Sequence, residues 1–181
     1  EMLINDPTSG KKVLSSILHE LTTCREFWFS VAFASKSGVA ALMNTLSELA
    51  ARQIPGKILV SQYLNFTQPE ALRALRQFSN IDLKIAVNND FHSKGYLFKH
   101  ETIDNLIIGS TNLTATAMCT NIEWNLRISG FAKSHIMLAA HREFQNSFEQ
   151  ATPVTEDFIE KYTQLYQRQF IDRRSMEKNV Q

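Results

Sequence analysis

The sequence predicts an α/β fold with a mixed, mostly parallel β-sheet flanked by helices on both faces. Short runs of β-branched and aromatic residues alternate along the chain with longer stretches in which apolar residues recur at helical spacing. The 181 residues suffice for one buried core. We therefore expect a single domain over 1–181, with 170–181 as a frayed polar tail or a linker to a further domain.

The first quarter of the chain predicts a helix, a strand, a helix and a strand. Turn and capping residues at 6–10 precede an apolar pattern that indicates a helix over 9–23. The aromatic run at 27–34 is typical of a strand buried on both faces. A second amphipathic helix is expected over 39–50, and Pro55-Gly56 ends it before a strand over 57–63.

The middle of the chain predicts a third helix and three strands. The helix is expected over 70–78, after Pro69, and the next strand over 82–87. Two further strands, 93–99 and 105–109, are separated by a short polar segment that indicates a hairpin. These two strands are the expected antiparallel part of the sheet.

The last third of the chain predicts three helices and one strand. A small helix is expected over 112–119 and a strand over 123–129. A long amphipathic helix follows over 133–149, and about the last 25 residues form another helix.

Composition excludes several classes of protein. A formal charge of +1 lacks the basic excess of a general nucleic-acid binder, so any phosphate chemistry must be local. Cys24 and Cys119 have no C-x-x-C spacing and indicate reduced thiols. No stretch is long and apolar enough for a membrane span, so we expect a cytoplasmic protein without a membrane partner. Signatures of P-loops, dinucleotide sites, zincins and α/β-hydrolases are absent from the sequence.

One cluster of residues can carry chemistry, and it begins with His92 and Lys94. On an extended segment both side chains project from one face, because side chains alternate with period two. The ammonium group can hold phosphate oxygens, and the imidazole can attack phosphorus or move a proton near neutral pH.

The second part of this cluster is Gly109-Ser110-Thr111-Asn112. If these residues open the small helix, a hydroxyl, a carboxamide and backbone N–H groups converge on an anion at its N-terminus. Glu123 starts the next strand and could accept a hydrogen bond from the imidazole, which would fix the tautomer.

Chance alone does not explain these two motifs together. In a shuffled chain of this composition, H-x-K arises about 0.3 times and G-S-x-N about 0.03 times. The other four histidines lack such a context, and we assign them no catalytic role.

The order H-x-K, hairpin, G-S-x-N and acidic residue resembles the phospholipase D superfamily, above all its short nucleases with a single motif, such as metal-independent restriction endonucleases and helicase-associated nuclease domains. The resemblance implies that His92 is a nucleophile that forms a phosphohistidine. It further implies that Lys94, Ser110 and Asn112 hold phosphate oxygens and that Glu123 orients the histidine. The family's aspartate, five residues after the lysine, is Lys99 in this sequence.

Stoichiometry predicts a C2 homodimer. The mechanism needs one histidine as nucleophile and a second as the acid for the leaving oxygen, and members of the family normally carry two motifs. Only His92 is followed two residues later by lysine. The second motif must then come from another subunit, and the active site is shared across the axis. No metal and no cofactor are expected, since lysines replace the electrostatic role of a cation.

Three functions follow as hypotheses. The first is a phosphodiesterase that cleaves DNA, for example as the nuclease domain of a restriction or defence protein. The second is a DNA-binding module with little or no turnover that serves a fused helicase or specificity domain; the substitution at Lys99 and the neutral charge favour it slightly. The third, lipid hydrolysis, is disfavoured because no basic amphipathic surface helix or membrane anchor is evident.

Overall fold

The structure, a computed structural model, describes residues 1–87 and 90–178. Its helices and strands agree with the predicted order, and most boundaries differ by only a few residues. In chain order the elements of the described residues are β1 (Met2–Leu3), α1 (Val13–Thr23), β2 (Glu26–Val31), α2 (Lys36–Ala51), β3 (Gly56–Ser61), the 3₁₀ turn η1 (Tyr63–Asn65), α3 (Pro69–Arg76), β4 (Ile81–Ala86), β5 (Lys94–Lys99), β6 (Ile103–Gly109), α4 (Ala115–Cys119), β7 (Asn125–Phe131), α5 (His135–Gln150), β8 (Thr152–Pro153) and α6 (Glu156–Lys178).

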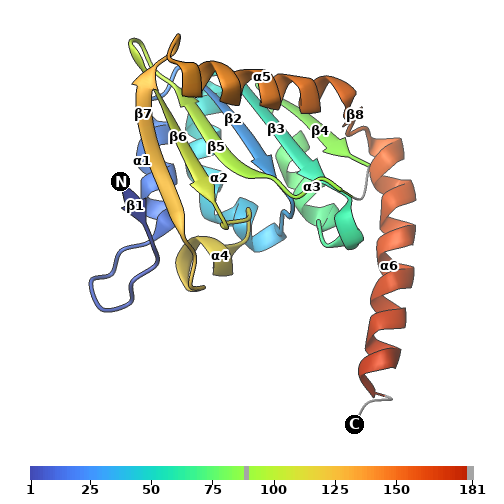
Figure 1. Ribbon diagram of the computed structural model, residues 1–181. Helices are drawn as coiled ribbons and strands as arrows, with labels where there is room; N and C mark the ends of the chain where they lie inside the picture. Colours follow the sequence, from blue (N-terminus) through green and yellow to red (C-terminus); the bar gives the residue numbers. More distant parts are fainter. Residues whose placement is uncertain (88–89, 179–181) are drawn as a thin grey trace.

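The strands form one mixed sheet in the order β1-β7-β6-β5-β2-β3-β4-β8 (Figure 1). Only β2 with β3 and β3 with β4 pair in parallel among the strands of the described residues. The other pairings are antiparallel. The sheet is therefore mostly antiparallel, and the prediction of a mostly parallel sheet is wrong.

The connections between strands explain this difference. A parallel pair needs a long crossover, and α2 and α3 supply one each, for β2–β3 and β3–β4. The described residues between β4 and β5 contain no helix, and β5 enters beside β2 in the opposite direction. Short connections then make β6 and β7 antiparallel neighbours. The edge strands β1 and β8 have two residues each, too few to produce a sequence pattern.

Helices cover both faces of the sheet, as predicted. One face packs against α1, α2, α3, α4 and α6 around a large core that includes Phe29, Leu42 and Tyr162. Among the described helices, only α5 crosses the other face, and its Met137 and Phe144 pack on the sheet in a smaller core. Figure 1 shows α5 lying across this face near one end of the strands.

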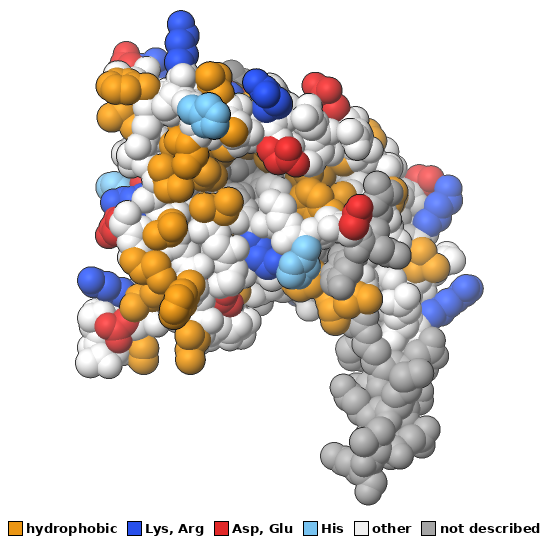
Figure 2. Space-filling model, in the orientation of Figure 1, with side chains coloured by type: hydrophobic (Ala, Val, Ile, Leu, Met, Phe, Trp, Pro, Cys, Tyr) orange, Lys and Arg blue, Asp and Glu red, His pale blue; other side chains and the backbone are white. Residues whose placement is uncertain are grey.

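Because α5 covers only part of its face, apolar side chains of the outer strands remain exposed. Met2 pairs with Leu126, and Leu126 pairs with Ile108, so the three side chains form a row across β1, β7 and β6. Each of the three is about half exposed, and Trp124, just before β7, is 70% exposed. We call these four residues the apolar strip. Figure 2 shows hydrophobic side chains gathered on this face over β6 and β7.

The predicted C-terminal helix is present as α6, which continues to Lys178. The expected role of 170–181 as a tail or a linker to a further domain stays a prediction. Residues 179–181 lie outside the described residues. None of the helices in the described ranges has the length and apolar character that crossing a membrane requires.

Candidate active site

His92 and Lys94 lie together at one end of the sheet. Lys94 is the first residue of β5, and His92 lies in the connection just before it. The Nζ of Lys94 is 3.0 Å from Nδ1 and 3.3 Å from Nε2 of His92, and it donates a 2.9 Å hydrogen bond to the His92 carbonyl. An ammonium group can only donate, so Lys94 can hydrogen-bond a ring nitrogen of His92 only in a tautomer that leaves that nitrogen without a proton. The imidazole itself is exposed to solvent.

The segment that carries Ser110 and Asn112 leaves the end of β6. A Cβ at Gly109 would overlap the backbone carbonyl of Trp124, so only glycine permits this close approach of the chain before β7. The buried hydroxyl of Tyr96 donates to the Thr111 carbonyl at 3.0 Å. Two strands, β5 and β6, therefore hold this segment next to Lys94.

A helix N-terminus does not form at Ser110–Asn112, and that prediction is wrong. The helix α4 begins at Ala115, and its N-cap is Thr114, whose hydroxyl accepts from the Ala117 N–H at 3.2 Å. The N–H groups of Ser110 and Thr111 donate to Trp124 and Asn125 instead. Any anion at this segment must therefore rely mainly on side chains, because these backbone donors are already used.

Glu123 lies next to Ser110. The Ser110 hydroxyl donates to the Glu123 carboxylate and accepts from the Trp124 N–H at 3.1 Å. The other carboxylate oxygen accepts from the Asn121 amide at 3.5 Å. Glu123 is almost fully buried, and it precedes β7 by two residues rather than starting the strand. The predicted bond from its carboxylate to His92 stays a prediction.

Asn112 is oriented by a backbone group next to β2, which pairs with β5 on the side away from β6. Its side-chain oxygen accepts a 3.1 Å hydrogen bond from the Phe33 N–H, just beyond the end of β2. This bond directs the oxygen inward and makes the NH₂ group the end of the carboxamide that an anion can use. The Phe33 ring also contacts the His92 ring edge-on, with centroids 5.7 Å apart. Phe33 thus lies between the two parts of the motif.

The charge at Lys94 depends on two opposing effects. Partial burial lowers the pKa of Lys94 below its ordinary value, and the negative charge of Glu123 raises it. The lysine and the glutamate are therefore electrostatically linked, although Lys94 begins β5 and Glu123 lies just before β7. The structure brings all five predicted site residues to the same end of the sheet.

Lys99, at the position of the family's aspartate, lies far from this site. It is the last residue of β5, five residues and about 16 Å along the strand from Lys94. There its Nζ contacts the Glu26 carboxylate at 3.1 Å and lies 3.5 Å from the centroid of the Trp28 ring. Its neighbour Asp104 is buried and pairs with His141 at 3.0 Å. The presence of Lys99 in place of the family's aspartate therefore affects the opposite end of the sheet, away from the motif residues.

Three residues that support the site were not predicted from the sequence. Tyr96 and Asn125 hold Thr111, with the Asn125 amide donating to the Thr111 hydroxyl at 2.9 Å. Phe33 orients Asn112, as described above. Asn125, a polar residue within the predicted strand 123–129, was the available signal, since backbone partners leave no pattern in the sequence. Among the described residues, no group of three His, Cys, Asp or Glu side chains could hold a metal ion.

The fold and this motif define a phospholipase D-like domain. The family described as "Cardiolipin synthase, PLD-like domain" matches residues 17–151, which is most of the chain. The chain therefore belongs to this family, as the resemblance of its motif implied. None of the curated proteins matches the sequence.

Solved structures with similar folds agree. NucT from Helicobacter pylori superposes with a TM-score of 0.66 at 17% identity, over 85% of this chain and 98% of NucT. Nuc from Salmonella typhimurium, a phospholipase D family member, gives 0.67 at 17% identity over 86% of this chain and 99% of Nuc. A phosphatidylserine synthase from Haemophilus influenzae gives 0.65 at 16% identity, over 99% of this chain and 46% of that protein. At such low sequence identity, these similarities show the fold alone.

Proposed function

We propose that this protein is a metal-independent phosphodiesterase that cleaves DNA through a covalent phosphohistidine, with an active site shared by two subunits. One observation carries the proposal. The ammonium group of Lys94 contacts the imidazole of His92 at the sheet end that also holds Ser110, Asn112 and Glu123. A nucleophile and a cation side by side are what phosphoryl transfer without a metal requires.

The proposed reaction has two steps. A ring nitrogen of His92 attacks phosphorus, a P–N bond forms, and the P–O bond to the leaving oxygen breaks. His92 of the second subunit gives its proton to that oxygen. Water then attacks phosphorus, gives a proton to the second imidazole, and releases the first. Lys94 and the Asn112 amide hold the phosphate oxygens as negative charge develops.

The homodimer is supported by the apolar strip. Ile108 lies directly before Gly109, and Trp124 directly after Glu123, so two of its residues adjoin the motif. A second copy docked on this strip would cover exposed apolar surface and bring a second His92 close to the first. We therefore place the dimer interface here.

Cleavage assays in EDTA test the proposal. We expect labelled DNA to be cut in EDTA, and His92→Ala to lower the rate at least about 10³-fold. His19→Ala is the matched control, because His19 is exposed on α1, outside the motif. Mass spectrometry of acid-sensitive adducts should find phosphate on the peptide with His92. A requirement for magnesium would overturn the mechanism, and tight DNA binding without product would favour the DNA-binding module instead.

A further inference from the structure

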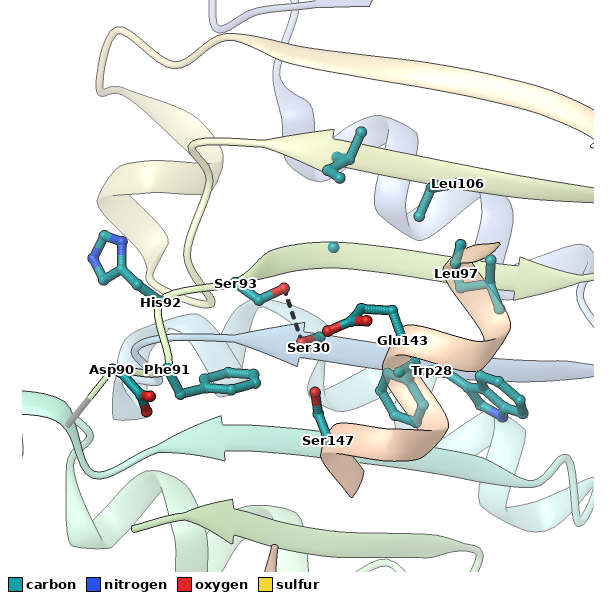
Figure 3. Close-up of a pocket in the computed structure, with 14 residues that line it drawn as sticks. Trp28, Ser30, Asp90, Phe91, His92, Ser93, Leu97, Leu106, Glu143 and Ser147 are labelled. Atoms are coloured by element: carbon teal, nitrogen blue, oxygen red, sulfur yellow. Dashed lines mark hydrogen bonds between the residues drawn. The ribbon is translucent and has the colours of Figure 1, made fainter. Parts of the chain in front are cut away.

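A pocket of about 340 Å³ opens beside His92, between α5 and the strands β2 and β5. Its polar groups come from both sides, as Figure 3 shows. Ser30 and Ser93 lie on the sheet side, where their hydroxyls are hydrogen-bonded at 3.1 Å. Glu143 and Ser147 project from α5. None of these four residues has a role in the reaction proposed above.

The remaining wall of the pocket is apolar and partly aromatic. Trp28 and Phe144 stack at 4.9 Å on one side, and Leu97 and Leu106 complete the floor. Phe91 is only partly buried and points into the pocket (Figure 3). A flat apolar group could therefore stack on an aromatic ring while its edge meets hydroxyl and carboxylate groups.

The pocket directly adjoins the proposed nucleophile, because His92 is one of its lining residues. Phe91 and Ser93 point into it, whereas the ring of His92 between them points away (Figure 3). A phosphate at His92 would thus lie at the edge of the pocket. The group attached to that phosphate is the part of a substrate that can enter.

Charge excludes a second phosphate from this pocket. Its charged lining residues are the carboxylates of Asp90 and Glu143, with no lysine or arginine among the lining residues of the described ranges. Two carboxylates repel a phosphate but can accept hydrogen bonds from amino groups. An acyl chain would bury these carboxylates and hydroxyls without partners, at a cost in free energy. A neutral, planar group with polar edges fits best.

We propose that this pocket binds an unpaired nucleobase next to the scissile phosphate, which makes single-stranded nucleic acid the substrate; this inference rests on the function proposed above. A base within a duplex is stacked and paired, so it cannot enter. Aromatic stacking and hydrogen bonds to the base edge would hold it. Through Glu143, the pocket favours bases with an amino group over thymine.

The first experiment compares single-stranded with double-stranded DNA as the substrate. A labelled oligonucleotide is cleaved by the whole protein, alone and annealed to its complement, with His92→Ala as the blank. We expect the single strand to be cut at least about tenfold faster. Equal rates on the two substrates would overturn the inference while leaving the proposed function intact.

The second experiment fills the pocket. Ser147→Trp places an indole inside it, and Asn146→Trp places the same group on the exposed side of α5. In a His92→Ala background, fluorescence anisotropy should show about tenfold weaker binding of a single-stranded oligonucleotide by Ser147→Trp than by Asn146→Trp. Equal affinity of the two variants would contradict base binding. This measurement needs no turnover, so it decides even if the enzyme proves inactive.

The third experiment tests the base preference. We expect wild type to cut oligo(dC) faster than oligo(dT), and Glu143→Gln to reduce that ratio several-fold. Glu149→Gln, exposed on the same helix and outside the pocket, is the control. An unchanged ratio would refute the role of Glu143.

A small phosphodiester and a lipid substrate test the phosphodiesterase proposal and the nucleobase proposal separately. Hydrolysis of bis(4-nitrophenyl) phosphate that depends on His92 would support the phosphodiesterase even if all three pocket tests fail. If phosphatidylcholine vesicles are hydrolysed, and Ser147→Trp but not Asn146→Trp abolishes this, the pocket holds a lipid and the nucleobase proposal is wrong.

Discussion

Single residues at this site act through their neighbours. Ser110 both donates to Glu123 and accepts from the Trp124 backbone, so its hydroxyl is fixed between two groups. Phe33 and Asn112 show the same dependence, since one backbone N–H sets the direction of a carboxamide. The motif residues are therefore held by several separate hydrogen bonds, which join them to each other in pairs or to neighbouring backbone groups.

The link between Glu123 and Lys94 predicts a change in pH dependence. Only protonated Lys94 attracts phosphate, so activity should fall as pH rises through its pKa, which burial lowers below the usual 10.5. Glu123 raises that pKa. Glu123→Gln should therefore move the alkaline limb of kcat/KM to lower pH.

The pH profile of kcat/KM, measured between about pH 6 and 10.5, checks this shift apart from any loss of rate. Glu48→Gln, an exposed change on α2, should leave the limb in place. A limb that stays at the same pH in Glu123→Gln would show that the two charges do not interact.

Tyr96 should contribute to stability through one buried hydrogen bond. Burial raises the pKa of Tyr96, so its hydroxyl stays protonated and donates to the Thr111 carbonyl. Tyr96→Phe removes the donor and leaves that carbonyl unpaired, which should lower the free energy of unfolding by about 1–2 kcal/mol.

Urea denaturation measures this loss. Tyr166→Phe, at a partly exposed ring on α6, should change stability by less than about 0.5 kcal/mol. A Tyr96→Phe variant as stable as wild type would mean that water or a shifted backbone replaces the lost bond.

Among the elements, those with strong local patterns were predicted well. The run at 27–34 correctly indicated a central strand, because β2 has neighbours on both sides and both of its faces are buried. The start of α4 was predicted too early, because Thr114 rather than a residue of 110–112 caps the helix. Serine, threonine and asparagine are all good caps, so the sequence offered several starts and tertiary contacts selected one.

The connection between β6 and β7 requires glycine at position 109. A Cβ there would collide with the carbonyl of Trp124 and the Asn125 side chain. Gly109→Ala should lower the free energy of unfolding by about 2 kcal/mol and displace Ser110, with a loss of activity larger than the loss of folded protein.

Gly95→Ala is a matched control on the adjacent strand, since its Cβ would meet nothing closer than 3.9 Å. Thermal denaturation of both variants provides the comparison of stability, and cleavage by Gly109→Ala is compared with that of wild type. If the two alanine variants are equally stable, the close approach at Gly109 is not required.

At the scale of the whole molecule, the proposed dimer predicts that a charge placed in the apolar strip disrupts dimerisation. Leu126→Glu puts a charge into the apolar strip and should convert a dimer into monomers, with loss of cleavage. Leu165→Glu is the control, because Leu165 is 46% exposed on α6 and Leu126 is 50% exposed. Sedimentation velocity distinguishes the two states. Monomeric wild-type protein, or a Leu126→Glu dimer, would contradict the proposed interface.

The sequence by itself determined the alternation of helices and strands and the family, and it named five candidate site residues, because hydrophobic periodicity and short chemical motifs are local. Only the tertiary structure decided the direction of strand pairing, the contacts of Ser110 and Asn112, the remoteness of Lys99, and the pocket beneath α5. These features join residues far apart in the chain, such as Phe33 with Asn112 and Ser30 with Ser93. A contact between distant segments depends on how the whole sheet packs, and no local pattern records it.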